Sequence, residues 1–138
     1  MQIIGRAFTG QAVAFDIDAR PIEIDAIAAA EAAIGGASLS TATSVAGAVT
    51  LNNAVAGTIT TEALTTAVGV IYTLTLTSNL IKATSVVIPV VTLGSATTGT
   101  AAIIHVTPAA GSVAIKVKNI DATNAFNGTI KVGFAIFQ

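Results

Sequence analysis

The stretch SVAIKVKNIDATNAFNGTIKVGFAIFQ, residues 112–138, determines the fold class because apolar and polar side chains alternate at both of its ends. A period of two is typical of β-strands with one buried face. The strands are expected over Ser112–Asn119 and residues 129–138, and the dipeptide Asn127-Gly128 predicts a tight turn just before the second. The apolar positions expected to face a core are Val113, Ile115, Val117, Ile130, Val132, Phe134 and Ile136.

Similar short strands are expected further upstream in the chain. They lie at Ala48–Asn52, Gly57–Leu64, Val70–Thr77, Ser85–Leu93 and Ala101–Thr107. In the third of these, Tyr72, Leu74 and Leu76 share one face. Pro89 confines its strand to a sheet edge or a bulge, because proline has no N–H to donate. The pattern predicts an all-β protein, a β-sandwich of about seven or eight strands, and both the jelly-roll and the Ig-like strand orders fit it.

The chain is expected to divide near Gly35-Gly36, into an N-terminal arm over residues 1–36 and a β-sandwich domain over residues 37–138. Within the arm, a short helix is expected near residues 22–34, because Pro21 suits a first turn and the alanine-rich run has high helix propensity. The start of that segment, residues 22–24, fits an extended conformation as well.

The charge content is low for a protein of 138 residues. Charged residues make up 9 % of the chain, against roughly 25 % in an ordinary soluble domain. Seven acidic and six basic residues nearly cancel, so binding to nucleic acid or to an anionic membrane is not expected. The chain contains no run of about 18 apolar residues, so a transmembrane helix is not expected. The low charge predicts a surface that other subunits cover.

No motif for catalysis is visible. The chain has no cysteine and no G-x-S-x-G or S-x-x-K signature, and the segment GSATTG at residues 94–99 reads as a plain turn. His105 is the only histidine, and it is expected to share a strand face with Ala101, Ile103 and Thr107 as a core or interface residue. We therefore predict a protein that is not an enzyme and uses no cofactor.

The segment AFDIDARPIEID, residues 14–25, gathers four carboxylates around one arginine. A calcium loop beginning at Asp16 would need an oxygen ligand at its fifth position and glycine at its sixth. Arg20 and Pro21 occupy those positions, so the match fails. A metal or acid/base site and a simple solvated face both stay open as alternatives to a docking segment.

We expect a docking arm, because alternation in an extended segment gives it an apolar edge and an acidic edge. Segment 1–36 could span on the order of 70–100 Å if extended. The residues expected to bind a partner are Phe8, Phe15, Asp16, Ile17, Asp18, Arg20, Ile22, Glu23, Ile24 and Asp25.

The pattern T-P-x-x-G-S-V-x-I-x-V-x-N-x-x-x-x-x-x-x-N-G-T-x-K-V-x-F, here Thr107 to Phe134, resembles small Thr/Gly/Val-rich β-sandwich modules of tailed-bacteriophage virions. The resemblance covers residues 45–138 and includes capsid decoration (cement) proteins and head or tail fibres. It implies a virion protein that commonly forms homotrimers. The long arm and the lack of repeats or a coiled coil in the sequence favour a decoration protein on the capsid exterior, assembled in the host cytoplasm and bound to the major capsid protein. The alternative that the resemblance implies is a fibre module that recognises a host-surface receptor.

Overall fold

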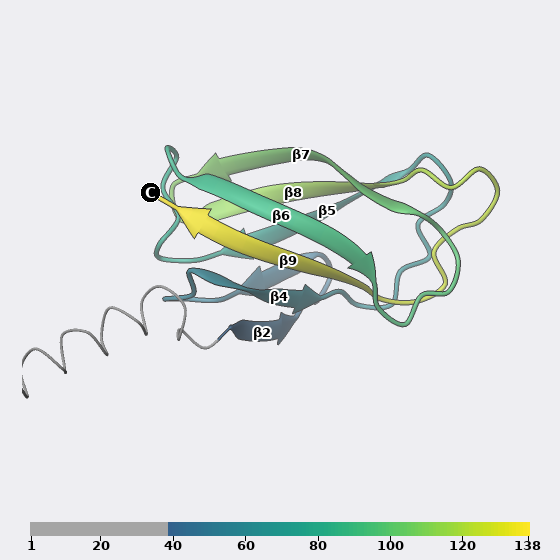
Figure 1. The fold of residues 1–138 in the computed structure, drawn as a ribbon, viewed down its shortest axis with the longest axis horizontal. Coiled ribbons are helices and arrows are strands. Elements are labelled where there is room, and N and C mark those ends of the chain that lie inside the picture. Colours follow the sequence, from purple (N-terminus) through teal and green to yellow (C-terminus); the bar gives the residue numbers. More distant parts are fainter. Residues whose placement is uncertain (1–38) are drawn as a thin grey trace, which may run out of the picture. The chain divides into compact units, whose positions relative to one another are not determined.

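Residues 39–138 are described by this computed structural model, and within them the chain forms eight β-strands in two layers (Figure 1). The strands are β2 (Ser40–Thr43), β3 (Ala48–Thr50), β4 (Ala56–Thr60), β5 (Ile71–Thr77), β6 (Val86–Leu93), β7 (Ala101–Ala109), β8 (Ser112–Asn119) and β9 (Ile130–Phe137). One sheet has the order β2-β4-β9-β6 and the other β3-β5-β8-β7. The predicted all-β sandwich is confirmed, while the predicted arm, its helix and the Gly35-Gly36 boundary lie outside the described residues.

The chain passes from one sheet to the other at every connection between β2 and β9 except one. The exception is the β7–β8 hairpin, whose two-residue turn has Gly111 at a φ of +85°. β2 pairs parallel with β4, and β3 pairs parallel with β5, whereas the other pairings are antiparallel. Both sheets are therefore mixed, and neither is built from consecutive strands alone.

A two-residue turn carries the chain from β2 to β3. Ala46 and Gly47 have φ angles of +51° and +78°, the combination found in tight hairpin turns of type I′. The backbone groups of Val45 and Ala48 donate to each other across the turn, with N···O distances of 3.0 Å. A side chain at Gly47 would lie 2.8 Å from the carbonyl oxygen of Thr73, so glycine is needed here for space as well as for conformation.

The core lies between the two sheets and confirms the alternation predicted for β5, β8 and β9. Tyr72 packs against this core at its border and is only partly buried. Pro89 lies in β6, which is an edge strand as predicted. The buried core residues of the described part are Val49, Ala54, Ile59, Leu64, Leu74, Leu76, Ile81, Val87, Val113, Ile115, Val117, Phe126, Ile130, Val132, Phe134 and Ile136.

The face predicted for His105 is wrong because β7 contains a β-bulge. The register with β8 shifts between Ile103 and His105, and an extra residue in one strand reverses the alternation beyond it. Ala101 and Ile103 pack against the core, and Val106 takes the next inward position. His105 and Thr107 are exposed, so His105 is not a core residue.

The tight turn predicted at Asn127-Gly128 is also not formed, since neither residue has a positive φ. The Asn127 carboxamide instead accepts from the backbone N–H groups of Thr97 (2.7 Å) and Thr98 (3.1 Å). A Cβ at Gly128 would lie 2.8 Å from the backbone nitrogen of Ala96. The two residues thus join neighbouring loops, and glycine is required by close packing.

Candidate functional site

All ten residues predicted to bind a partner, from Phe8 to Asp25, lie outside the described residues. The structure therefore neither brings them together nor separates them. The candidate sites below are drawn from residues 39–138.

A hydrogen-bonded cluster in that part joins Ser44, Glu62 and Tyr72. The Ser44 hydroxyl donates to Glu62 Oε1 at 2.6 Å, and the Tyr72 hydroxyl donates to both carboxylate oxygens, at 3.2 and 3.1 Å. Burial alone raises the pKa of Glu62, but the hydrogen bonds from Ser44, the backbone and Tyr72 outweigh it and leave the pKa lowered. Burial and the neighbouring carboxylate raise the pKa of Tyr72 to about 12.

The burial of Ser44 and the mutual hydrogen bonds of the cluster favour a structural role. Ser44 is 1 % exposed, so a substrate cannot reach its hydroxyl. A carboxylate with a lowered pKa is a weak base near neutral pH. The three residues come from the turn after β2, the segment after β4, and β5, so their hydrogen bonds tie the corner turn to both sheets.

A second polar cluster centres on Asn119, which is fully buried at the end of β8. Its carboxamide donates to the carbonyl oxygens of Thr66 (3.0 Å) and Asn124 (2.9 Å). It accepts from the backbone N–H groups of Thr100 and Asp121, both at 3.1 Å. One side chain thus fixes three loops at the same end of the sandwich.

Asp121 shapes one of those loops, the connection between β8 and β9, rather than offering a free carboxylate. Its Oδ1 accepts from the backbone N–H groups of Thr123 and Asn124, each at 2.8 Å. These backbone hydrogen bonds lower the pKa of Asp121. The arrangement is a local turn motif, and its hydrogen-bonding capacity is largely used within the loop.

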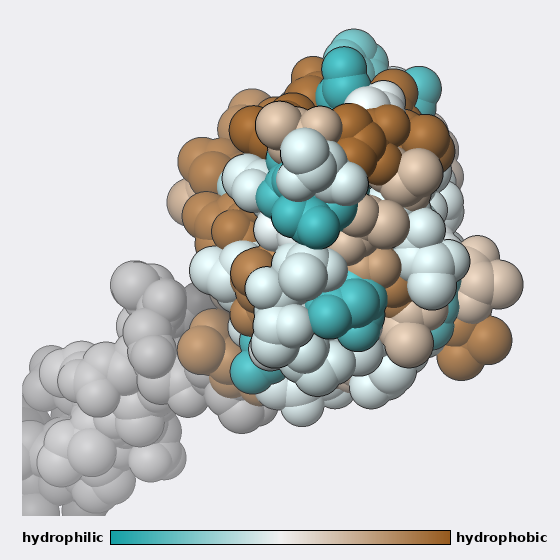
Figure 2. Space-filling view, turned by 90° about the vertical axis from the view of Figure 1, so that its right-hand side faces the viewer, coloured by the Kyte–Doolittle hydropathy of each residue, from teal (hydrophilic) through white to brown (hydrophobic). Residues whose placement is uncertain are grey.

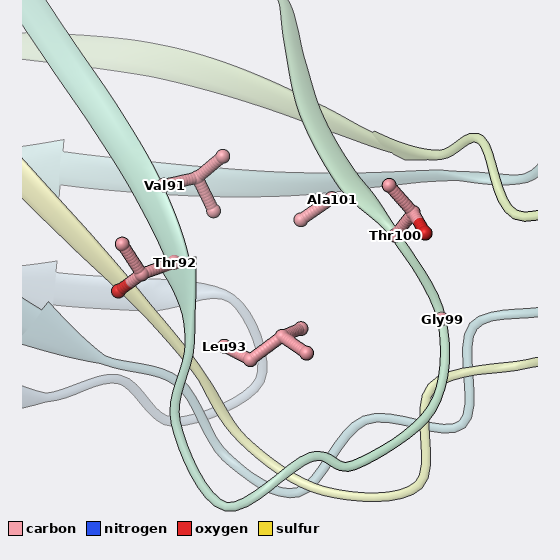
Figure 3. A pocket seen from close by; sticks show the side chains of 6 residues that line it. All are labelled: Val91, Thr92, Leu93, Gly99, Thr100 and Ala101. Carbon is pink, nitrogen blue, oxygen red and sulfur yellow. The ribbon is translucent and has the colours of Figure 1, made fainter.

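A shallow pocket of about 240 Å³ lies between β6 and the start of β7 (Figure 3). In Figure 3 the side chains of Val91, Leu93 and Ala101 point into the space between the two strands, whereas Thr92 points away. The residues that line it are Val91, Thr92, Leu93, Gly99, Thr100 and Ala101. Since none of them titrates, the pocket offers contact area for a small apolar group and no acid–base chemistry.

The outer face of the sheet β3-β5-β8-β7 is polar and weakly basic. Its exposed positions are mainly threonine, alanine and serine, and the register places Lys116 between Thr73 and His105. Lys118 lies on the same face of β8. The described residues hold four lysines against Glu62 and Asp121, whereas residues 1–38 hold two arginines against five carboxylates.

The outer face of the other sheet is apolar over two strands, and we call this part the β6–β9 face. Its residues are Val86, Ile88 and Val90 of β6 with Gly133, Ala135 and Phe137 of β9, which lie opposite one another in pairs. Val86, Ile88, Val90 and Phe137 are 58, 53, 60 and 55 % exposed. Figure 2 shows hydrophobic residues gathered along one side of the described sandwich. An exposed group of this kind marks a contact surface more often than a site of chemistry.

The β6–β9 face could not have been found from alternation alone. The run Val86–Leu93 is apolar at nearly every position, which fits a strand covered on both sides. The sequence therefore indicates that both faces of β6 avoid water. Only the sheet order shows that β9 is the strand that lies beside β6 in the exposed face.

Within residues 39–138, no helix is long and apolar enough to cross a membrane. The same part of the chain contains no group of three or more His, Asp or Glu side chains placed to hold a metal ion.

In comparisons with known proteins, no family model, no curated protein and no solved structure matches the chain.

Proposed function

We propose that this chain is a non-enzymatic structural protein of a phage virion, a decoration or cement protein that binds the head as a homotrimer and stabilises it. The observation that carries the proposal is the exposed, uncharged β6–β9 face on a sandwich with few charges elsewhere. A surface of this kind is suited to lasting contact with other protein subunits.

The winding of the chain supports the same proposal by analogy of fold. The chain crosses between the sheets at nearly every connection, and it returns so that β8 pairs with β5 and β9 pairs with β4. This is the strand order of a jelly roll with fewer strands. It lacks the several same-sheet hairpins of the Ig-like order. Jelly rolls are common among viral capsid domains, although a fold by itself does not assign a function.

The acidic segment 16–25 supplies the second contact in this proposal. Its carboxylates would meet basic groups of the major capsid protein, while many copies engaging neighbouring subunits would add up to strong attachment. In the homotrimer, the three sandwich domains would then form one body that carries three such segments.

The test uses phage heads that lack this protein. Added full-length chain is expected to co-sediment with the heads and raise the temperature at which they release DNA. A variant with Asp16→Asn, Asp18→Asn, Glu23→Gln and Asp25→Asn is expected to bind at least about tenfold more weakly. Glu31→Gln, in the same arm over residues 1–36 but outside the acidic segment 16–25, serves as the control. Equal binding and equal stabilisation by the fourfold variant would contradict the assigned contact, and failure of the wild-type chain to bind would contradict the function.

The alternative, a fibre module that recognises a host receptor, has less support in the described residues. Recognition of a glycan commonly uses an exposed aromatic platform. Tyr72 is half-buried and hydrogen-bonded to Glu62, and Phe126 and Phe134 are in the core. Phe137 is 55 % exposed, but it lies beside aliphatic residues in the β6–β9 face. Binding of the purified protein to host cells would favour this alternative over the cement protein.

A further inference from the structure

We infer that the β6–β9 face is the surface through which copies of this chain contact one another. The inference deepens the proposed function, because it rests on the homotrimer and names the surface that builds it. It does not depend on the head or on the acidic segment. Three features of the face identify a second copy as its occupant: its charge pattern, its area and the proline in its edge strand.

The charge pattern is that of an interface core with a polar rim. No charged side chain lies among the paired positions from Val86–Phe137 to Val90–Gly133. The next pair on this outer face is Thr92–Lys131, and Lys131 is followed across the sheet by Thr60 of β4. Contacts between identical subunits are more apolar than other interfaces and are depleted of charge at the centre.

The exposed area is of the size that subunit association requires. From their exposed fractions, Val86, Ile88, Val90 and Phe137 together present on the order of 400 Å² of apolar surface. A stable interface buries roughly 800 Å² on each partner, of which the apolar centre is about half. The face therefore supplies such a centre, and the neighbouring threonines and alanines supply the remainder.

Pro89 indicates that copies meet through this face, turned toward a shared axis, and not by joining their sheets edge to edge. It lies in the middle of β6, the free edge of its sheet. Proline in an edge strand leaves the outer edge without a donor at that point. An added strand would thus lose a ladder hydrogen bond at its centre, whereas packing on the β6–β9 face is unaffected.

The chain's own acidic segment is a poorer occupant on grounds of charge. Residues 1–38 hold five carboxylates, and the β6–β9 face offers them only Lys131 at one end. Lys116 and Lys118 lie on the outer face of the other sheet. Burying carboxylates against valine and isoleucine without partners would cost free energy.

The test is sedimentation equilibrium of the full-length chain and three variants at about 1–100 μM. Ile88→Glu and Val90→Glu place a charge at the centre of the face, and both side chains point outward, so the fold should tolerate them. Ile71→Glu is the matched control, because Ile71 is 47 % exposed on the outer face of the other sheet. Circular dichroism verifies that each variant is folded.

We expect the wild-type chain and Ile71→Glu to have three times the 13.6 kDa mass of one chain. Ile88→Glu and Val90→Glu should weaken association by about 100-fold or more. If the wild-type chain is a dimer and these two variants are monomers, the β6–β9 face is supported as the contact surface and the trimer is contradicted. A monomeric wild-type chain, or equal association by Ile88→Glu and Ile71→Glu, would overturn the inference. If the chain associates only after removal of residues 1–36, the inference would also be overturned, because that segment would then be the occupant of the β6–β9 face. Failure to bind phage heads has no bearing on any of these masses.

Discussion

Replacing Gly99 by alanine should be one of the most damaging small changes in the sandwich, for two separate reasons. Gly99 has a φ of +90°, and a residue with a side chain pays about 1–2 kcal/mol to adopt such a conformation. The added Cβ would also lie 2.8 Å from Cε1 of Phe126. Phe126 is 1 % exposed in the core, so it cannot move aside freely.

The structure offers controls that separate the two contributions. Gly111 and Gly69 have φ angles of +85° and +76°, and a Cβ at either would meet no atom within 4 Å. Gly111→Ala and Gly69→Ala should therefore lose only the backbone contribution of about 1–2 kcal/mol. Gly99→Ala should lose a further 1–3 kcal/mol or so from overpacking. The total approaches half of a typical stability of roughly 5–15 kcal/mol.

The measurement is urea unfolding of the three variants, with thermal unfolding as a second readout. For a domain of this size, 1 kcal/mol corresponds to about 4–8 °C in Tm. Phe126→Leu in the Gly99→Ala background should recover part of the loss, giving a coupling free energy of about 0.5–3 kcal/mol. Equal destabilisation by Gly99→Ala and Gly111→Ala, together with no coupling to position 126, would refute the reasoning.

Two further predictions concern the polar clusters. Asn119→Asp keeps the side-chain shape but replaces the N–H donor facing the carbonyl oxygens of Thr66 and Asn124 with a charged acceptor. Urea unfolding at pH 7 should therefore show a loss of about 2–4 kcal/mol in the free energy of unfolding, and the loss should shrink as the pH falls and the carboxylate protonates. A variant as stable as wild type at pH 7 would contradict this prediction. Because Tyr72 is the only tyrosine and its pKa is raised from 10.0 to about 12, its phenolate absorbance should appear only near pH 12, and Glu62→Gln should shift this titration to lower pH. The stability that the neutral phenol contributes should be complete below pH 10 and lost as the pH rises through about 12. A Tyr72 that titrates near pH 10 in the folded wild-type chain would show that the cluster is not formed.

The strands with strict alternation could be predicted because burial of one face imposes a period of two on the sequence. Ser112–Asn119 and Val70–Thr77 coincide closely with β8 and β5. β2 was not predicted, since its residues STAT carry no large apolar side chain and its place depends on pairing with β4. The β7 bulge could not be predicted either, because Ile103 and Ile104 are equally apolar and only the register with β8 decides which faces inward.

The polar clusters were beyond sequence reasoning for a different reason. Ser44, Glu62 and Tyr72 are separated by 18 and 10 positions, and each residue is ordinary by itself. Asn119 has no distinguishing neighbour in the sequence, yet it joins three loops because the sheets end together at that point. The Asn127-Gly128 signal was misleading because tertiary contacts to Thr97 and Ala96 determined the local geometry instead.

The central position of β9 has a consequence for how the protein is made. β9 lies between β4 and β6 and is the last of the described strands to be synthesised. Until it leaves the ribosome, β4 is paired only with β2, β6 has no partner in its sheet, and their apolar residues stay exposed. The sandwich therefore closes only after β9 has been synthesised, so demand on chaperones should fall late in the synthesis of this domain and not on its early segments.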